Sequence, residues 1–421
     1  MQYPDQLGIE PRRQPVEAVV RPPGSKSFTN RALVTAGLAA GVSHLHDPLE
    51  ADDTGVMRNG LRDLGVSIDD NDDPWLVLGS GGALLPPIAP IDAGLSGTTA
   101  RFLLAVASLV PGEVTVTGRG RLLERPHREL FDALRAAGVE VVSTDQRLPA
   151  TVHGHGYLPG GKIRVDPTRS SQFVTALLLV APLAQSQVEI ALTGPAVSRS
   201  YLTSTLEVMA AFGAIVEEDE DWFRVAPGGY RSAHYHIEAD ASAAAYPLVA
   251  AAITGGTIGV EGIPATSTQP DLAIVGVLEA MGCSARRTAH RLDLMAPARL
   301  QPVDVDMNIA PDAVLALAVA CLFADGSSRI RNVGNLRYKE SDRLAALVTE
   351  ISRVGASARV EGDDLVVIPG PLHPAIIDTY DDHRMAMAFA VLGLRQPGIV
   401  IDRPGVVTKT WPAFFDMLGQ L

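Results

Sequence analysis

The chain has 421 residues, of which 47% are hydrophobic and only 5% aromatic, so its core must be built mainly from Ala, Leu and Val. A formal net charge of −13 repels nucleic acid and anionic membranes at long range, so an anionic ligand would need a few locally placed cations. Two cysteines exclude a disulfide scaffold and indicate a reducing compartment. No signal peptide is visible, and the longest apolar runs, of about a dozen residues, are too short to span a bilayer. We therefore expect a cytoplasmic protein.

In chain order, the sequence repeats one pattern six times. An Ala-rich run without a polar face, typical of a buried helix, comes before an amphipathic helix that ends in an apolar cluster and a glycine. The buried helices are expected over residues 32–40, 100–110, 173–184, 242–254, 312–324 and 385–394, and the amphipathic helices are expected to end before Gly65, Gly138, Gly213, Gly282, Gly355 and Gly419.

Strand-like alternations accompany these helices, as at 113–117, 189–192 and 329–333. The sequence therefore predicts an α/β fold of six units, each with two helices and several short strands, in which sheets wrap around buried helices. Three units precede about residue 237 and three follow it.

The last unit lacks a closing strand, and residues 16–20 read as a strand that could supply it. We therefore expect 22–237 to form one domain, inserted into a second domain made of 1–21 and 238–421. The two chain crossings, near 22–24 and 237–240, would then act as a hinge.

Polar side chains gather at the fronts of the predicted helices. Free backbone N–H groups and the positive end of the helix dipole attract anions there. If the helices of each domain lie parallel, these fronts share one surface, and two such surfaces would form a cleft for a small, multiply anionic pair of substrates. The residues at these fronts are Lys26, Ser27, Arg31, Ser96, Gly97, Thr98, Arg101, Arg125, Arg128, Ser170, Ser171, Gln172, Ser198, Tyr201, Asp312, Lys339, Glu340, Arg343, Asp382, His383, Arg384 and Lys409.

Single members of this set have simpler explanations. Ser170 and Ser198 alone would most often be helix caps, and a lone arginine is most often a solvated ion-pair partner. Lys339 and Arg343, however, are like charges four residues apart, which is unfavourable on one helix face unless an anion lies between them. This conflict favours anion binding, although Glu340 could serve simply to neutralise the pair.

Two further motifs carry less information. The string Gly24-Ser25-Lys26-Ser27 is similar to a phosphate loop but lacks the leading glycine and the Gly-Lys pair, so it does not support an ATP site. Each of three His-x-His pairs would share one strand face and could hold a metal, but none has a Cys or Glu at ligand spacing. We expect exposed strand faces and no metal site at these pairs, which are His44/His46, His153/His155 and His234/His236.

Taken together, the motifs closely resemble the 5-enolpyruvylshikimate-3-phosphate synthase family over nearly the whole chain. The resemblance implies an inside-out α/β barrel fold with two domains of three repeated units each and an active site in the cleft between them. The strings that carry the resemblance are Pro23-Gly24-Ser25-Lys26-Ser27 with Asn30-Arg31, Asp52-Asp53 with Met57, Ser96-Gly97-Thr98 with Arg101, Glu124-Arg125-Pro126, Ser170-Ser171-Gln172-Phe173, Pro311-Asp312-Ala313, Arg337-Tyr338-Lys339-Glu340-Ser341-Asp342-Arg343, Asp382-His383-Arg384-Met385-Ala386 and Lys409-Thr410-Trp411-Pro412.

The resemblance also implies an activity, a step of aromatic amino-acid biosynthesis. The enolpyruvyl group of phosphoenolpyruvate would pass to the 5-hydroxyl of shikimate 3-phosphate through a tetrahedral intermediate that releases phosphate. Shikimate 3-phosphate would contact Lys26, Ser27, Arg31, Ser170, Ser171, Gln172, Ser198, Asp312, Asn335 and Lys339. Phosphoenolpyruvate would contact Lys26, Gly97, Arg125, Gln172, Arg343, Arg384 and Lys409.

The catalytic residues implied are Asp312 as general base, Glu340 as the acid that protonates the methylene carbon, and Lys26, which would touch both substrates. How the acid and base roles divide among the three stays open. The reaction would need no metal or organic cofactor, and the domains of a monomer would close on the substrates by induced fit. Two carboxylates suit a reaction in which one proton is removed and another delivered.

This sequence departs from the family pattern at Leu95 and Asp381, where many members have Asn, and at Phe102, where many have Pro. We expect these changes to tune affinity. A glycine at position 97 is a feature that this chain shares with glyphosate-sensitive members of the family. Leu95 and Phe102 leave the glyphosate sensitivity of this chain open.

Two alternatives are considered. The related enolpyruvyl transferase that acts on UDP-N-acetylglucosamine has a Lys-Asn pair in place of Lys26-Ser27. It also usually has a reactive cysteine on a mobile loop, whereas Cys283 and Cys321 are expected in helices. A non-catalytic relative would be expected to lack Asp312 or Glu340, and both are present.

Overall fold

The computed structural model describes residues 3–421. These residues form two compact units by their contacts: a continuous unit, Gly24–Ile237, and a discontinuous unit, made of the described residues up to Pro23 together with Glu238–Leu421. Each unit has its own hydrophobic core. Within residues 3–421, no helix combines the length and the apolar character needed to cross a bilayer.

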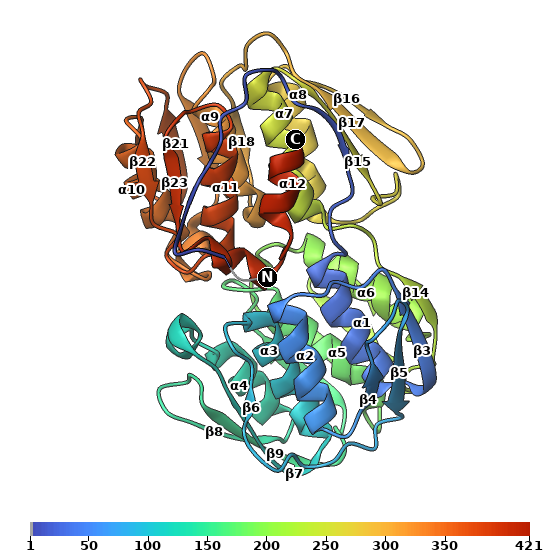
Figure 1. Cartoon of the computed structure of the whole chain (residues 1–421). Helices are drawn as coiled ribbons and strands as arrows, with labels where there is room; N and C mark the ends of the chain where they lie inside the picture. The colour runs from blue at the N-terminus through green and yellow to red at the C-terminus, as the bar shows by residue number, and fades with distance from the viewer. Residues whose placement is uncertain (1–2) are drawn as a thin grey trace. The chain divides into compact units, whose positions relative to one another are not determined.

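The continuous unit has three Ala- and Leu-rich helices at its centre, with sheets arranged around them (Figure 1). Nearly every residue of these helices is buried, as expected for helices without a polar face. They are α1 (Lys26–Leu38), α3 (Gly97–Val106) and α5 (Gln172–Val180), and they alternate along the chain with α2 (Asp52–Asp63), α4 (Arg128–Ala136) and α6 (Ser200–Ala211).

Three four-stranded sheets belong to this unit. Their strand orders are β14 (His234–His236), β3 (Ala40–His46), β5 (Trp75–Ser80), β4 (Ser67–Asp69); β6 (Ile91–Asp92), β7 (Pro111–Thr117), β9 (Ala150–His155), β8 (Glu140–Ser143); and β10 (Gly161–Val165), β11 (Val188–Leu192), β13 (Trp222–Val225), β12 (Val216–Glu218).

The discontinuous unit repeats this plan. Its buried helices are α7 (Ala241–Thr254), α9 (Val314–Cys321) and α11 (His383–Gly393), and they alternate with α8 (Ala273–Ala280), α10 (Arg343–Arg353) and α12 (Phe414–Gln420). Its sheets have the orders β2 (Glu17–Val20), β15 (Thr257–Glu261), β17 (Arg291–Met295), β16 (Ser284–Arg287); β18 (Asp304–Asp306), β19 (Ser328–Arg331), β21 (Asp364–Ile368), β20 (Ser357–Glu361); and β22 (Ala375–Ile377), β23 (Ile399–Asp402), β1 (Gln6–Gly8).

The six predicted units of two helices and short strands are therefore present. None of the strand orders found between residues 3 and 421 closes on itself, so the sheets are open and the structure contains no closed barrel in that range. The sheets instead lie around buried helices, as predicted.

Five of the six predicted helix-ending glycines have the left-handed backbone that suits a glycine after a helix, with φ between 83° at Gly213 and 102° at Gly282. The sixth prediction is wrong. Gly419 lies inside α12, which continues to Gln420. An apolar cluster followed by glycine therefore does not end a helix unless the chain also turns there.

The prediction that residues 16–20 close the last unit is also wrong. These residues do form a strand, β2, but it pairs in parallel with β15, with Val19 opposite Gly259. The last sheet is closed by β1, which runs antiparallel to β23 with Leu7 opposite Ile401. Alternation along a strand indicates which face is buried but does not identify the partner strand, and β1 is too short to show any alternation.

The pairing of β2 is one of two exceptions to a common pattern, and both exceptions lie at the chain crossings between the two units. In four of the units, the strand before the buried helix lies parallel to the strand after it, as in β6–α3–β7. The exceptions are β2, which precedes α1 but pairs with β15, and β14, which precedes α7 but pairs with β3. Just before the chain leaves the discontinuous unit, β2 completes a sheet of that unit, and just before the chain leaves the continuous unit, β14 completes a sheet there.

Candidate active site

The discontinuous unit contains a carboxylate that is held by three cations. Asp312 Oδ1 accepts from Arg343 Nη1 at 2.9 Å and from Lys339 Nζ at 3.4 Å, and Asp312 Oδ2 accepts from Arg384 Nη2 at 3.0 Å. An anion therefore does lie between Lys339 and Arg343, and it is the carboxylate of Asp312.

The fronts of three helices bring these groups together. Asp312 lies in the short 3-10 helix η5 (Pro311–Ala313), which leads into α9, while Arg343 begins α10 and Arg384 lies in the first turn of α11. Lys339 follows η6 (Gly334–Tyr338) and is not part of α10. The prediction that Lys339 and Arg343 share a helix face is therefore wrong, because α10 starts only at Arg343.

Arg343 is the centre of a buried charge network. Its Nε donates to Asp382 Oδ2 at 2.7 Å, its Nη2 donates to Asp382 Oδ1 at 3.2 Å, and its Nη2 also lies 2.9 Å from Glu340 Oε2. Asp382 additionally accepts from Ser341 Oγ at 3.0 Å and from the backbone N–H of Arg384 at 2.9 Å, which caps α11. Asp382 thereby fixes both the Arg343 guanidinium and the start of α11.

The cluster balances its charges internally. Burial alone would raise the pKa of Asp312, but Arg384, Lys339 and Arg343 together lower this pKa well below its usual range. Burial alone would lower the pKa of Arg343, whereas Asp382, Glu340 and Asp312 raise it above its ordinary value. Asp312 and Arg343 are therefore held in their charged forms.

In the continuous unit, the fronts of α1 and α2 meet through Lys26, whose Nζ lies 3.0 Å from Oδ2 of the buried Asp53. The fronts of α3 and α5 meet through Gln172. Its Nε2 donates to Thr98 Oγ1 at 3.1 Å, and its Oε1 accepts from Arg101 Nη1.

Gly97 gives Arg125 room to approach the front of α3. A Cβ built on Gly97 would lie 2.6 Å from Arg125 Nη1 and 3.3 Å from Arg101 Nη1, so any side chain at this position would have to displace a guanidinium group. Two cations thus lie against the buried backbone at the start of this helix, where N–H groups without a helical partner favour an anion.

Arg31 makes three hydrogen bonds within the protein. Its guanidinium donates to Thr205 Oγ1 at 2.8 Å, to the Ser27 carbonyl at 2.9 Å and to the Tyr201 carbonyl at 3.3 Å. Burial lowers the pKa of Arg31 to about 10, an effect that Tyr201 and Tyr235 partly oppose. Arg31 therefore joins α1 to α6, and these bonds use three of the five N–H donors of its guanidinium.

Three of the four predicted site serines, Ser170, Ser171 and Ser198, lie in loops before helices, whereas Ser27 lies in the first turn of α1. Ser170 Oγ accepts from the Gln172 backbone N–H at 3.2 Å, as a cap does, whereas the Ser171 side chain makes no capping bond to α5. Ser198 has a φ of 54°, a left-handed conformation that is rare for a non-glycine residue and typical of functional loops.

Two other predicted residues belong to 3-10 helices. Asn335 lies in η6, and its buried Oδ1 accepts no hydrogen bond within the part of the chain that the structure describes. Lys409 ends η7 (Pro404–Lys409), is buried, and lies on an element that packs against α11. Both therefore lie on segments beside α10 and α11, the helices that carry Arg343 and Arg384.

Sequence reasoning assigned no role to Asp53, Asp382 or Arg101. All three were visible inside the quoted motif strings, next to residues that did receive roles. What the sequence could not provide was the partner of each: Lys26 for Asp53, Arg343 for Asp382 and Gln172 for Arg101.

Neither cysteine is a reactive thiol. Cys321 lies in α9 as predicted, but Cys283 follows the end of α8 and is not helical, so the prediction of a helix there is wrong. Both side chains are buried. Burial raises the pKa of Cys283 to about 11, with a further contribution from Glu279, and burial raises that of Cys321 to about 12.

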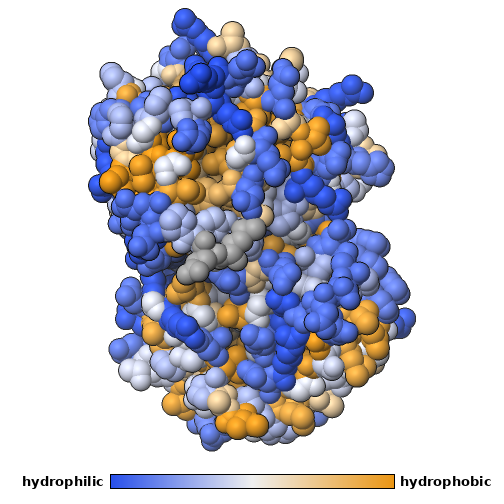
Figure 2. Space-filling model, in the orientation of Figure 1, coloured by the Kyte–Doolittle hydropathy of each residue, from blue (hydrophilic) through white to orange (hydrophobic). Residues whose placement is uncertain are grey.

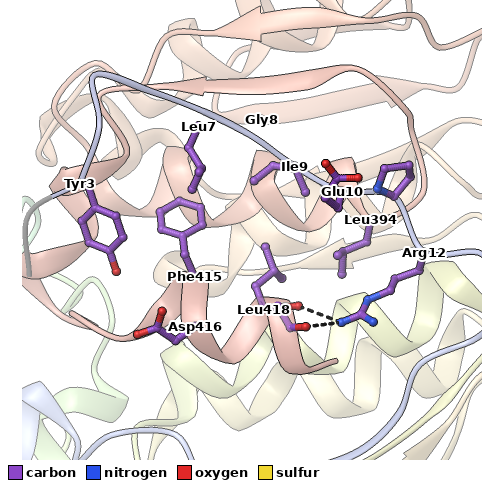
Figure 3. A pocket seen from close by; sticks show the side chains of 12 residues that line it. Tyr3, Leu7, Gly8, Ile9, Glu10, Arg12, Leu394, Phe415, Asp416 and Leu418 are labelled. Carbon is purple, nitrogen blue, oxygen red and sulfur yellow. Dashed lines mark hydrogen bonds between the residues drawn. The ribbon is translucent and has the colours of Figure 1, made fainter.

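A hollow of about 490 Å³ between the N-terminal segment and α12 contains none of the predicted site residues (Figure 3). Two of its polar side chains, Arg12 and Tyr3, already have partners. Arg12 Nη2 donates to the Gly419 carbonyl at 2.8 Å and to the Leu418 carbonyl at 3.4 Å, and Tyr3 OH donates to the Pro412 carbonyl. These bonds attach the N-terminal segment to α12 and to the residues just before it, and we assign no ligand to this hollow.

Comparison with known proteins agrees with the resemblance seen in the motifs. Residues 11–418 match the family described as EPSP synthase (3-phosphoshikimate 1-carboxyvinyltransferase). A 3-phosphoshikimate 1-carboxyvinyltransferase of Trichormus variabilis is 40% identical over 99% of this chain and 100% of the relative. The protein of the same name from Shewanella amazonensis is 41% identical over 99% of each chain.

Solved structures share the fold. An EPSP synthase from Acinetobacter baumannii superimposes with a TM-score of 0.82 at 24% identity, covering 99% of this chain and 98% of the other. The enolpyruvyl transferase NikO from Streptomyces tendae superimposes with a TM-score of 0.78 at 17% identity, covering 99% and 96%. These structures establish the architecture, and the match to the sequence family and its relatives extends over nearly the whole chain. The chain therefore belongs to the EPSP synthase (3-phosphoshikimate 1-carboxyvinyltransferase) family.

Proposed function

We propose that this protein transfers the enolpyruvyl group of phosphoenolpyruvate to the 5-hydroxyl of shikimate 3-phosphate. The observation that carries the proposal is the cluster around Asp312, in which a carboxylate is held by three cations while a second carboxylate, Glu340, lies 2.9 Å from one of them. Family membership supplies the substrates, and the cluster supplies groups for the proton transfers and for binding anions.

The reaction requires one proton to be moved at each reacting partner. The 5-hydroxyl oxygen bonds to C2 of phosphoenolpyruvate and loses its proton, while C3 gains a proton and becomes a methyl group. The resulting tetrahedral intermediate then loses phosphate from C2 and a proton from C3, which restores the enol double bond. We assign removal of the hydroxyl proton to Asp312 and protonation of C3 to Glu340, with Lys26 contacting both substrates.

The low pKa of Asp312 in the free protein fits this role if the substrate replaces the carboxylate as the partner of the cations. Arg343 and Arg384, which hold Asp312 at 2.9 and 3.0 Å, are the groups we assign to phosphoenolpyruvate. When its phosphate and carboxylate take these donors, Asp312 loses the interactions that lower its pKa and becomes a stronger base. Substrate binding would thereby activate the base.

The remaining cations would stabilise the departing phosphate. We assign Lys409 and Arg125 to phosphoenolpyruvate, together with the backbone at Gly97 and the amide of Gln172. Arginine suits these positions because its planar guanidinium can bind a carboxylate or phosphate through two parallel hydrogen bonds. Charge that develops on the leaving group would then meet donors that are already in place.

The shikimate 3-phosphate side of the site draws on both units. We assign its contacts to residues of the continuous unit and to three residues of the discontinuous unit. The first group is Lys26, Ser27, Arg31, Ser170, Ser171, Gln172 and Ser198, and the second is Asp312, Asn335 and Lys339. The left-handed backbone of Ser198 and the buried, unbonded Oδ1 of Asn335 support ligand contacts at these two positions.

Because the proposed roles divide between 22–237 and the remainder of the chain, we further propose that the two units close on the substrate pair, which would exclude water and complete the site. The proton transfers and charge neutralisation are assigned to side chains, so no metal or organic cofactor is required. Action as a monomer in the cytoplasm stays a prediction.

The acceptor can be tested directly. Phosphate release from phosphoenolpyruvate should occur with shikimate 3-phosphate and not with UDP-N-acetylglucosamine. The raised pKa values of Cys283 and Cys321 argue against the second acceptor, because neither residue offers a reactive thiolate. Release with UDP-N-acetylglucosamine alone, or with neither acceptor, would contradict the proposed function.

A further inference from the structure

Two of the three His-x-His pairs, distant in sequence, lie on neighbouring strands of the continuous unit. Strands β3 and β14 run in parallel with His44 opposite His234 and His46 opposite His236, and the intervening Leu45 and Tyr235 point into the core. All four imidazoles therefore project from the same outer face of this sheet. The third pair, His153/His155, lies on β9, where His153 is 3.4 Å from Glu113.

The four imidazole rings form two stacks, and one nitrogen of one stack lies close to one nitrogen of the other. His44 stacks on His234 with centroids 4.1 Å apart, and His46 stacks on His236 with centroids 4.2 Å apart. Between the two stacks, His46 Nε2 and His234 Nδ1 lie 3.4 Å apart. Two imidazole nitrogens bound to one Zn²⁺ at the tetrahedral angle are separated by about 3.3–3.4 Å, because each Zn–N bond is about 2.0–2.1 Å long.

We propose that His46 and His234 form a clamp for a divalent transition-metal cation such as Zn²⁺. The ion would replace the contact between His46 Nε2 and His234 Nδ1, and water would complete its coordination. His44 and His236 would act as supports, because each stacks on one of the two ligand rings and limits its rotation.

The surroundings suit a cation with imidazole ligands. The carboxylate of Asp73 adds negative charge near His46, and its Oδ1 accepts from the backbone N–H of Asp47 at 2.9 Å.

The outer face is otherwise apolar next to the histidines. Leu76 on β5 lies opposite His44, and Leu78 lies opposite Val42. All three of these apolar side chains are exposed, and Figure 2 shows hydrophobic surface at the side of the unit where β3 and β5 lie. No competing cation comes from these β5 positions.

The clamp differs from a closed structural zinc site. Within residues 3–421, no group of three or more His, Cys, Asp or Glu side chains has the arrangement of a metal site. A pair of protein ligands leaves two or more coordination positions to water, so binding should be reversible and weaker than at a four-ligand site.

Metal binding at this position would secure the strand at which the chain leaves the continuous unit. The residue after β14, Ile237, donates its backbone N–H to the His46 carbonyl at 3.0 Å, and the next residue belongs to the discontinuous unit. A cation that joins His46 to His234 would therefore add a cross-link between β3 and β14 immediately before the crossing, and would stabilise this unit by mass action.

The test uses the full-length chain without a polyhistidine tag. Zn²⁺ titration followed by calorimetry at neutral pH should show one site, and His46→Asn or His234→Asn should each weaken it by about 10²-fold, because each removes the chelate effect. His153→Asn is the matched control and should leave the affinity unchanged. The circular dichroism of each variant without metal should equal that of the parent, since all three side chains lie on strand faces away from the core.

A second measurement identifies the ligands. Electron paramagnetic resonance of the protein with one equivalent of Cu²⁺ should show two bound nitrogens in the parent and one in His46→Asn. Equal Zn²⁺ affinity in the parent and in the His46→Asn/His234→Asn double variant would overturn the proposal. An effect of His153→Asn as large as that of His46→Asn would also overturn it, since binding would then be distributed over surface histidines.

Discussion

Replacing Gly97 by alanine isolates the role of the space at the front of α3. The added Cβ would lie 2.6 Å from Arg125 Nη1 and 3.1 Å from Arg125 Cζ, and ordinary contact begins at 3.4 Å. The guanidinium therefore has to retreat by about 0.8 Å, the difference between 3.4 and 2.6 Å. A hydrogen bond to a charged group contributes about 1.5–3 kcal/mol, so losing one should raise the KM for phosphoenolpyruvate by about 10- to 150-fold.

The assay is phosphate release at saturating shikimate 3-phosphate with phosphoenolpyruvate varied, and then with the two substrates exchanged. The KM for shikimate 3-phosphate should change little, because Gly97 and Arg125 are both assigned to phosphoenolpyruvate. Gly276→Ala is the matched control: Gly276 lies in α8, and a Cβ there meets no atom within 4 Å. It should leave both KM values unchanged and stabilise the fold by about 0.5–1 kcal/mol.

A double-mutant cycle tests the cause. If the methyl group acts by displacing Arg125, then Gly97→Ala should have much less effect in an Arg125→Lys background than in the parent. A folded Gly97→Ala protein with an unchanged KM for phosphoenolpyruvate would refute the reasoning. Strictly additive effects in the cycle would refute the assigned cause.

Three other variants test the charge network and the cysteines. Asp312→Asn should lower kcat by about 10²–10⁴-fold with KM values largely kept, as measured by phosphate release, and near-normal turnover would reject the general-base role. The same variant should be about 3 kcal/mol less stable at neutral pH, because three cations lose their carboxylate. Folding lowers the pKa of Asp312, so its carboxylate stabilises the fold fully above the unfolded pKa of about 3.9, and this stabilisation is lost as the pH falls through the folded pKa. The difference in Tm between parent and variant should therefore shrink below about pH 4. A constant difference would contradict the pKa shift. Asp382→Asn should raise the KM for phosphoenolpyruvate and lower Tm together, because Asp382 both positions Arg343 and caps α11, and a change in Tm alone would limit Asp382 to a structural role. Cys283→Ala/Cys321→Ala should retain the parental kcat, and loss of turnover in a folded double variant would restore a thiol-dependent mechanism.

The repeated units could be predicted because the physical signals are local. Buried helices lack a polar face, and amphipathic helices end at glycines such as Gly65 that adopt a left-handed backbone. The partner of each strand could not be predicted, because alternation in a segment such as 16–20 specifies a face and says nothing about which strand lies beside it. The exchange of β2 and β14 between the sheets is therefore invisible in the sequence.

The candidate site shows the same limit. The charged residues of the Asp312 cluster were identified from their positions at helix fronts, but their mutual contacts depend on how α9, α10 and α11 pack. Lys339 was wrongly placed on a helix, since the spacing of Lys339 and Arg343 is compatible with a helix that in fact begins only at Arg343. His46 and His234, separated by 188 residues, could be related only through the pairing of β3 with β14.

The position of β1 has a consequence for the order in which the molecule is made. Gln6 and Asp402, which are hydrogen-bonded through their side chains, are 396 residues apart, whereas every strand of the continuous unit finds its partner within Gly24–Ile237. At about 5–20 residues per second, the ribosome needs roughly 20 to 80 s to make the chain between β1 and β23. β1 thus leaves the ribosome well before its partner β23 is made, and in the interval it presents unsatisfied backbone groups that a chaperone, or another nascent chain, could bind.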